Sequence, residues 1–306
     1  MNYSNKFNFV KHRNVFFAIS GILILAGIVT LLLFQMNYGV DFKAGTSIDV
    51  SVGQAITKEK AQEIYKGAGF DQTVTIGGAN GDRVSTRFDE ILGKEQVDKI
   101  KAAFEAPYKD KVSMEVNTVS PDIAKELAIK AIIGILIASV AISIYVSIRF
   151  EWRFAVAAII SILHDAFIVV AMFAIFRFEV DLPFVAAVLT TVGYSINDKI
   201  VIFDRIRENL RFAKLKTPED LEKLVHDSTW QTMARNINTV LTVLIAAVCL
   251  FIFGSESIKL FALAKIIGLT SGAYSSICIA SPLWYLLKRN SLGNKRKAAP
   301  AAAAKE

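Results

Sequence analysis

A carboxylate inside an apolar stretch is the group in this sequence best suited to chemistry. Asp198 lies within residues 182–203, a run long enough and apolar enough to cross a membrane. On insertion scales a charged side chain at the centre of a span costs ~2.5–3.5 kcal/mol, so such a group usually faces the interior of a helix bundle and pairs with a cation. Its chemistry there is the uptake and release of a proton. Asp198 is therefore the first candidate for a titrating group.

An arginine in the next apolar segment is the candidate counter-ion. Arg235 is followed by Asn238, Thr239 and Thr242, at offsets that place all four on one face of a helix. Two interpretations of an Asp198–Arg235 pair stay open. In one, protonation of Asp198 breaks the pair and lets the helices shift. In the other, a static ion pair fixes the register of two helices.

Further polar side chains accompany these two. Lys199 is adjacent to Asp198 but points ~100° away around a helix, so we expect it to extend toward a membrane surface. His164 and Asp165, within residues 154–176, are interpreted equally as a proton relay or as a structural pair. One polar helix face is predicted around Asp198, formed by Thr191, Tyr194, Ser195 and Arg205. The supporting residues for either interpretation are Thr191, Ser195, Asn197, Asn238 and Thr239.

The sequence offers no support for enzyme, cofactor or metal chemistry. Its three histidines, at positions 12, 164 and 226, have no second histidine or cysteine at ligand spacing. Cys249 and Cys278 both lie in apolar runs and are interpreted as fillers. No phosphate-binding loop of the Gly-x4-Gly-Lys-Ser/Thr type is present. We therefore predict no metal, no cofactor and no enzymatic activity.

The apolar runs predict a polytopic helical membrane protein. Hydrophobic residues make up 53% of the 306 residues, and a helix needs ~20 apolar residues to cross ~30 Å of hydrocarbon. We expect spans at residues 15–35, 124–148, 154–176, 182–203, 229–254 and 258–287. The first is too long for the apolar part of a cleaved signal peptide, so it is expected to be a retained anchor.

The distribution of Lys and Arg predicts the orientation. Basic residues gather in residues 1–14, in the connection between the second and third spans, in the connection 204–228 and in the tail 288–306, whereas the opposite short loops carry only Arg177 and Lys259. Both termini are therefore expected in the cytoplasm, and the Ala-rich tail is expected to be disordered. The net charge of +7 arises in these flanks, which argues against nucleic-acid binding.

The segment 36–123 is the one sizeable region outside the predicted spans. Its patterns predict the order β-α-β-β-α-β, typical of a small ferredoxin-like α+β domain. We expect it on the extracytoplasmic side, where it contains no His or Cys and shows no ligand spacing. Recognition at a surface is its expected role.

Five motifs, in order, resemble the SecF branch of the SecD/SecF family. The longest is GYSINDKIVIFDRIREN, residues 193–209. The others are GVDFKAGT at 39–46, LHD at 163–165, ARNINT at 234–239, and GAYSS at 272–276 with ASP at 280–282. The resemblance covers about residues 10–290. The motif residues expected to be structural are Asp41, Gly45, Gly193, Asp204, Arg205, Tyr274 and Pro282.

The resemblance implies half of an assembly of the resistance-nodulation-division (RND) type. SecD would supply the other half, and the pair would work with the SecYEG channel and other Sec accessory membrane proteins in the bacterial inner membrane. Protons would drive late translocation of a preprotein on the outer side, with Asp198 and Arg235 as coupling residues. Ala44, Lys199 and Asn236 depart from the family pattern, which has Gly, a small or hydroxyl residue, and Thr there.

Two other functions are kept as alternatives. One is a structural subunit that stabilises the SecD complex and has no proton step of its own. The other is an RND-type exporter of small molecules, which the single small outer domain disfavours.

Overall fold

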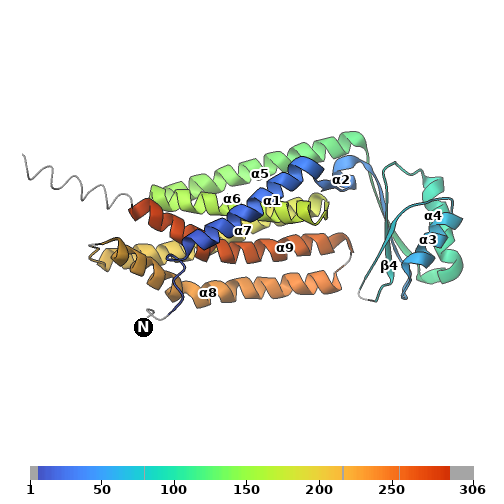
Figure 1. Ribbon diagram of the computed structural model, residues 1–306. Helices are drawn as coiled ribbons and strands as arrows, with labels where there is room; N and C mark the ends of the chain where they lie inside the picture. The colour runs from blue at the N-terminus through green and yellow to red at the C-terminus, as the bar shows by residue number, and fades with distance from the viewer. Residues whose placement is uncertain (1–5, 79, 216, 255, 290–306) are drawn as a thin grey trace, which may run out of the picture.

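The computed structural model describes residues 6–289, apart from positions 79, 216 and 255. Within these residues, six helices are long and apolar enough to cross a membrane, as predicted. They run side by side, with a small α/β domain at one end (Figure 1). The helices are α1 (Arg13–Phe34), α5 (Pro121–Arg149), α6 (Trp152–Ile175), α7 (Leu182–Phe212), α8 (Pro218–Phe253) and α9 (Glu256–Ser275), which continues through a π-helical turn, η2 (Ser276–Ala280).

A polar capping residue and a proline at the first or second helical position start three of these helices. Ser120 Oγ accepts a hydrogen bond from the Ile123 N–H before α5, and Asp181 Oδ1 accepts one from the Phe184 N–H before α7. Thr217 forms a reciprocal capping box with Asp220 at the start of α8. Such caps satisfy N–H groups that have no partner inside the helix.

The connection predicted at residues 204–228 is much shorter in the structure. Helix α7 continues to Phe212 and α8 begins at Pro218, so both helices extend beyond the apolar runs. The reason is that α-helical hydrogen bonding does not end where the hydrophobic pattern ends. The predicted tail, 288–306, lies almost wholly outside the described residues.

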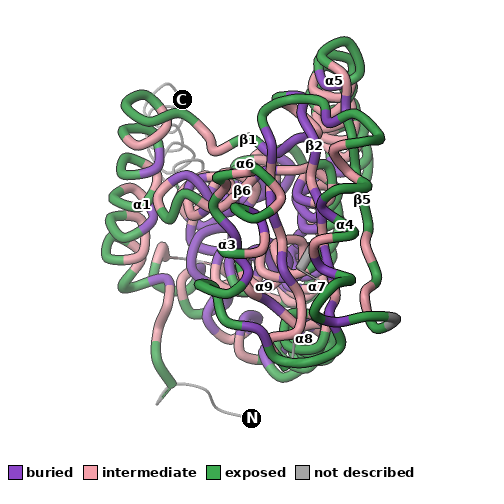
Figure 2. Tube along the Cα trace, turned by 90° about the vertical axis from the view of Figure 1, so that its right-hand side faces the viewer, coloured by how far each residue is buried: buried purple, intermediate pink, exposed green. Residues whose placement is uncertain are grey.

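Helices α6, α7 and α9 form the interior of the bundle. About half or more of their most apolar stretches is buried (56%, 50% and 61%), against 11% or less for α1, α5 and α8. Helices α1 and α5 lie at the rim and are largely exposed (Figure 2). Close approach of α7 and α9 depends on Gly268, where an added Cβ would lie 2.3 Å from Thr191 Oγ1.

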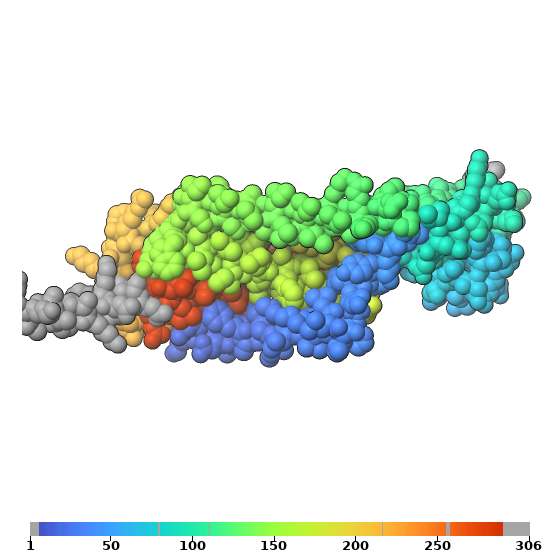
Figure 3. Space-filling view, turned by 90° about the horizontal axis from the view of Figure 1, so that it is seen from above, coloured from blue at the N-terminus to red at the C-terminus, as the bar shows by residue number. Residues whose placement is uncertain are grey.

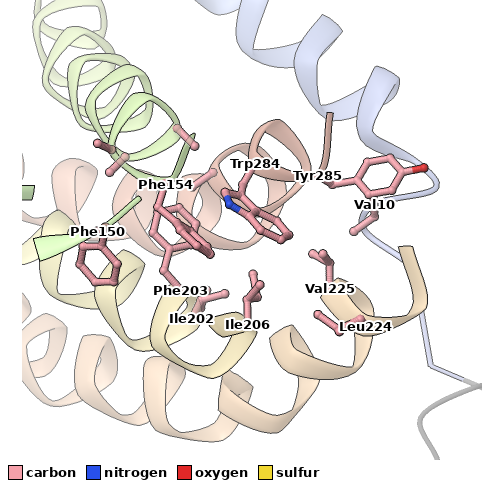
Figure 4. Close-up of a cluster of buried hydrophobic side chains, with 14 of the residues drawn as sticks. Val10, Phe150, Phe154, Ile202, Phe203, Ile206, Leu224, Val225, Trp284 and Tyr285 are labelled. Carbon is pink, nitrogen blue, oxygen red and sulfur yellow. The ribbon is translucent and has the colours of Figure 1, made fainter. Parts of the chain in front are cut away.

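An aromatic cluster closes the bundle at the end away from the α/β domain. The Phe154 ring stacks on Trp284 with centroids 4.6 Å apart, and Phe203 packs against Phe154 at 5.0 Å. Val225 of α8 and Val10 of the N-terminal segment complete the cluster (Figure 4). This packing holds together α6, α7 and the helical segment 281–289 that follows η2, next to the polar residues described below.

The α/β domain has the predicted order of strands and helices. Its elements are β2 (Gly45–Ser51), α3 (Lys58–Gly67), β3 (Val74–Gly77), β4 (Arg83–Phe88), α4 (Lys94–Tyr108), the 3₁₀ turn η1 (Lys109–Lys111) and β5 (Ser113–Val119). The antiparallel sheet has the strand order β3-β4-β2-β5. One core joins the sheet and both helices, and it includes Ile48, Tyr65, Phe88, Ile100 and Phe104.

Short elements after α1 attach this domain to the helices. Strand β1 (Asn37–Tyr38) pairs in parallel with β6 (Glu179–Val180), which precedes α7, and α2 (Val40–Lys43) follows β1. Arg87 on the sheet forms an ion pair with Glu179 at 2.9 Å. Figure 3 shows the domain at one end of the helices, joined by the chain after α1 and the start of α5.

Acidic residues at this junction are partly buried. Asp41 Oδ2 accepts a hydrogen bond of 2.9 Å from the Leu182 N–H. This motif residue therefore links α2 to the start of α7. Burial raises the pKa of Asp181 to about 6, against the opposing effect of its hydrogen bond from Phe184. Burial also raises the pKa of Glu179, although Arg87 opposes that shift. Binding of a proton by Asp181 or Glu179 therefore reduces the electrostatic repulsion between these residues and Asp41.

Ala44 has a backbone conformation that favours glycine. Its φ is 69° and its ψ is 162°, a region that is essentially restricted to Gly and costs on the order of 1–3 kcal/mol for other residues. We expect Ala44→Gly to raise the free energy of unfolding by up to about that amount, measured by thermal or denaturant melting. Gly45→Ala is the matched control and should destabilise, because its Cβ would meet the Phe88 carbonyl oxygen at 2.2 Å. Equal melting of A44G and the parent chain would contradict this.

Candidate functional site

The carboxylate of Asp165 is the centre of a buried polar cluster between α6, α7 and α9. Its Oδ2 accepts hydrogen bonds from Ser195 Oγ and Ser275 Oγ, at 2.5 and 2.7 Å. Its Oδ1 accepts one from Ser271 Oγ at 3.0 Å and lies 3.0 Å from His164 Nδ1. Asp165 has no exposed surface. Contacts at both oxygens suit a charged carboxylate, which can accept several hydrogen bonds.

Lys199 provides the counter-charge of this cluster. Its Nζ lies 2.8 Å from Asp165 Oδ2 and donates to Ser275 Oγ at 3.1 Å and to Ser195 Oγ. The side chain is fully buried, so the expectation that it extends toward a membrane surface was wrong. The physical reason is that an ion pair with Asp165 compensates desolvation inside the bundle, where removing either partner leaves an uncompensated charge.

Helical periodicity brings these residues together. Ser195 and Lys199 are four residues apart on α7, and Ser271 and Ser275 are four residues apart on α9, so each pair shares one helix face. Directly after Ser275 the helix widens into the π-helical turn η2. The buried Pro282 lacks an N–H group and so removes one α-helical hydrogen bond, which accounts for the widened turn before the helix resumes over residues 281–289.

A second branch of the cluster runs from His164 to α1. The Nε2 atom of His164 lies 2.9 Å from Ser20 Oγ, which lies 3.1 Å from Tyr274 Oη. Tyr274 in turn donates to the Phe16 carbonyl at 2.9 Å. The predicted His164–Asp165 pair and the motif residue Tyr274 therefore belong to one hydrogen-bonded network that ties α1 to the interior helices.

Asp198 is buried but stands apart from this network. It is 5% exposed, and the structure records no hydrogen bond or ion pair to it among the described residues. Lys199, the next residue, is bound to Asp165 instead. The site thus contains one carboxylate surrounded by donors and one carboxylate without a donor.

The predicted direct pair between Asp198 and Arg235 is not formed. Arg235 is exposed and lines a hollow of about 280 Å³ with residues nearer the end of α7, including Asp204 and Glu208. The register of α7 and α8 explains this, because Asn209 Nδ2 donates to Ser228 Oγ at 2.8 Å. Arg235 lies two helical turns after Ser228 on α8. The α7 residues beside it therefore come about one helical turn or more after Asp198.

The other predicted polar residues divide between the interior and the surface. Thr191 and Ser195 are buried as expected, and Thr191 Oγ1 has no hydrogen-bond partner within the described part of the chain. Tyr194, predicted on the same face, is 44% exposed. Asn197 and Gly193 of α7 and Asn238 of α8 are also exposed, whereas Thr239 is half-buried and donates to the Arg235 carbonyl at 2.9 Å.

The motif residues at the end of α7 form surface ion pairs. Asp204 pairs with Arg207 at 2.7 Å and with Arg149 of α5 at 3.7 Å. Arg205 pairs with Glu208 at 2.6 Å. The Asp204–Arg149 pair joins α7 to α5, and all three pairs lie outside the buried cluster.

Four residues of the cluster were missed as site residues by sequence reasoning: Ser20, Lys199, Ser271 and Ser275. The four-residue spacing of the serines was visible, but serine is common in membrane helices, and only the fold places them against Asp165. No group of three or more His, Cys, Asp or Glu that could hold a metal ion occurs among the described residues.

Comparison with known proteins places the chain in a family. Residues 99–290 match the C-terminal part of the protein export membrane protein SecD/SecF, and residues 29–56 match the SecD/SecF GG motif. The chain is 46% identical to protein translocase subunit SecF of Alicyclobacillus acidocaldarius over 291 residues, 94% of each chain. It is 45% identical to protein translocase subunit SecDF of Bacillus subtilis, but covers 39% of that longer protein.

A solved structure gives the same result. The crystal structure of SecDF from Thermus thermophilus, described as a translocon-associated membrane protein, superposes with a TM-score of 0.80 at 31% identity. The match covers 94% of this chain and 39% of that one, so the chain spans about two-fifths of a SecDF protein. The motifs, the six helices and these matches agree: the chain belongs to the SecD/SecF family of protein-export membrane proteins, as a relative of SecF.

Proposed function

We propose that this chain is an auxiliary subunit of the Sec translocase. It pairs with SecD and uses the proton motive force to assist preprotein translocation across the bacterial cytoplasmic membrane. Both termini lie in the cytoplasm, and the α/β domain, which we group with ferredoxin-like folds on its strand order, lies outside and contacts the preprotein. The SecYEG channel and other Sec accessory membrane proteins are the further partners.

The observation that carries the proton step is the burial of Asp198 without a donor. Its neighbour Asp165 has donors at both oxygens, and Lys199 is committed to Asp165. A carboxylate in a membrane interior with no fixed cation is the group there that gains most from binding a proton. Asp198 therefore takes up and releases the coupling proton.

The partner surface is a polar face on α7 and α8. We define this α7–α8 polar face by its exposed residues Thr190, Tyr194, Asn197, Arg235, Asn238 and Thr242. Exposed amide and guanidinium groups are costly against hydrocarbon, so within a membrane such a face contacts protein or water. The SecDF relatives carry more than half of their length outside the region matched by this chain. A SecD half packed on this face completes the surroundings of Asp198 and supplies its missing partner, and Arg235 faces the same side.

Pairing through this face can be tested with bulky substitutions. We expect Asn197→Trp and Asn238→Trp to reduce the amount of chain recovered with affinity-tagged SecD by about tenfold, which corresponds to ~1.4 kcal/mol. Ser147→Trp is the matched control, because Ser147 is exposed on α5, a helix that contributes no residue to the polar face. Melting temperatures of all three variants establish that each is folded. Equal recovery of N197W, N238W and S147W would exclude this face as the SecD contact.

A further inference from the structure

Hydrogen-bond directions in the branch toward α1 fix where its protons lie. Tyr274 Oη must donate to the Phe16 carbonyl, since a carbonyl only accepts. The contact between Ser20 Oγ and Tyr274 Oη then needs the Ser20 proton. Because Ser20 has one proton, its contact with His164 Nε2 must be donated by the ring. His164 therefore carries a proton on Nε2.

The other ring nitrogen of His164 also needs a proton. Its Nδ1 lies 3.0 Å from Asp165 Oδ1. A neutral imidazole has a single N–H, and the contact with Ser20 uses it. A second proton must therefore lie between His164 and Asp165.

The same counting shows that Lys199 is a full ammonium. Ser195 uses its one proton toward Asp165 Oδ2, and Ser275 directs its proton to the same oxygen at 2.7 Å, which is closer than its other acceptor, the Gly272 carbonyl at 3.2 Å. The contacts of Lys199 with both serine hydroxyls and with Asp165 are then donated by Nζ and need its three N–H groups, and the Ser195 carbonyl lies farther away at 3.3 Å. The serine hydroxyls and the Lys199 ammonium all donate to the Asp165 carboxylate, which is therefore ionised and acts as an acceptor. The proton between Asp165 Oδ1 and His164 Nδ1 then belongs to His164.

The charges of the cluster then involve Asp198. The cluster then holds two positive charges, on His164 and Lys199, and one negative charge, on Asp165. The net positive charge is costly in a dry protein interior. Asp198, buried and next to Lys199 in the sequence of α7, is a carboxylate that can balance it. Among the described residues, the other printed partners of the His164 ring are uncharged: Ser20 from α1, which it contacts by a hydrogen bond, and Tyr274 from α9, whose ring lies beside it.

We propose that His164 is a second proton-binding site of this chain, held by Asp165 and Ser20 and coupled in charge to Asp198. The coupling deepens the proposed function, on which it rests: a proton bound by Asp198 removes the balancing charge, and the proton on His164 Nδ1 leaves. The location of the proton on His164 stands on hydrogen-bond geometry alone.

Nitrogen NMR of the full chain, labelled with ¹⁵N-histidine and reconstituted in lipid bilayers, tests the proposal. Only three histidines contribute signals, and His12→Gln and His226→Gln assign the other two. At neutral pH we expect both ring nitrogens of His164 to be protonated. Asp198→Asn, which mimics protonated Asp198, should convert one of them to an unprotonated nitrogen. Lys130→Met, at an exposed ion pair of α5, should leave the spectrum of His164 unchanged.

Two results would overturn the proposal in separate ways. An unprotonated ring nitrogen on His164 in the unmodified chain would show that the site holds no second proton. A doubly protonated ring that is the same in D198N would refute the charge coupling. Neither result bears on whether Asp198 couples export to the proton gradient, because export is not the measured quantity.

Discussion

Replacing Lys199 with Met is expected to lower the free energy of unfolding by about 3–5 kcal/mol, the usual cost of removing one partner of a buried ion pair. The variant keeps the length and apolar stem of the side chain but removes three N–H donors. Asp165 would remain fully buried and lose the ammonium that donates to it, and the oxygens of Ser195 and Ser275 would lose a donor. Denaturant or thermal unfolding in detergent or bilayers measures the loss.

A matched control separates burial from the chemistry of the substitution. Lys130→Met makes the same change in another membrane helix, where Lys130 pairs with Glu126 at 2.6 Å and both side chains are more than half exposed. Exposed pairs contribute roughly 0.2–1 kcal/mol, so K130M should melt close to the parent chain. A loss in K199M no larger than that in K130M would contradict the structural account of the cluster.

The double variant Asp165→Asn with Lys199→Met tests whether the loss comes from the stranded charge. Removing both charges of a buried pair is often close to neutral, whereas removing one is not. The double variant should therefore recover most of the stability lost by K199M. The difference between the double variant and the sum of the single variants gives the coupling energy of the pair. Additive losses would indicate that Lys199 contributes by packing and not by its charge.

The helices and the order of elements could be predicted from the sequence because their signals are local. Six apolar runs and the β-α-β-β-α-β pattern depend on neighbours within a helix or strand, and the structure contains both. Helix ends were harder to predict: α7 and α8 continue past their apolar parts, and the connection between them is correspondingly short.

The partners of the charged residues could not be predicted in the same way. Asp198 and Arg235 looked like a pair because each is costly alone in a span and they lie on successive spans. Pairing depends on the register of α7 against α8, and Asn209 sets that register at a position where the sequence gives no signal. Lys199 was misassigned for a related reason: its direction around α7 was clear, but what lies in that direction was known only from the fold.

Replacing Asp198 with Asn is expected to abolish the part of preprotein translocation that depends on the proton gradient. An amide at this position has nearly the same shape but cannot change charge. Moving one charge through a potential of 100 mV supplies ~2.3 kcal/mol, so the gradient-dependent stimulation that disappears could be as large as about fiftyfold at that potential. Translocation into inverted membrane vesicles that contain SecD and the channel, with and without a proton ionophore, measures it.

This variant also separates the proton-coupled subunit from a purely structural one. In D198N the complex with SecD should still assemble, since the substitution leaves the exposed residues of the α7–α8 polar face unchanged. Asp198→Glu, which keeps a titratable group, should retain part of the stimulation. If D198N translocates as the parent chain does and still responds fully to the gradient, Asp198 is not the coupling group. The structural role would then be favoured, because the Asp165–Lys199 pair would hold the helices together without any proton step.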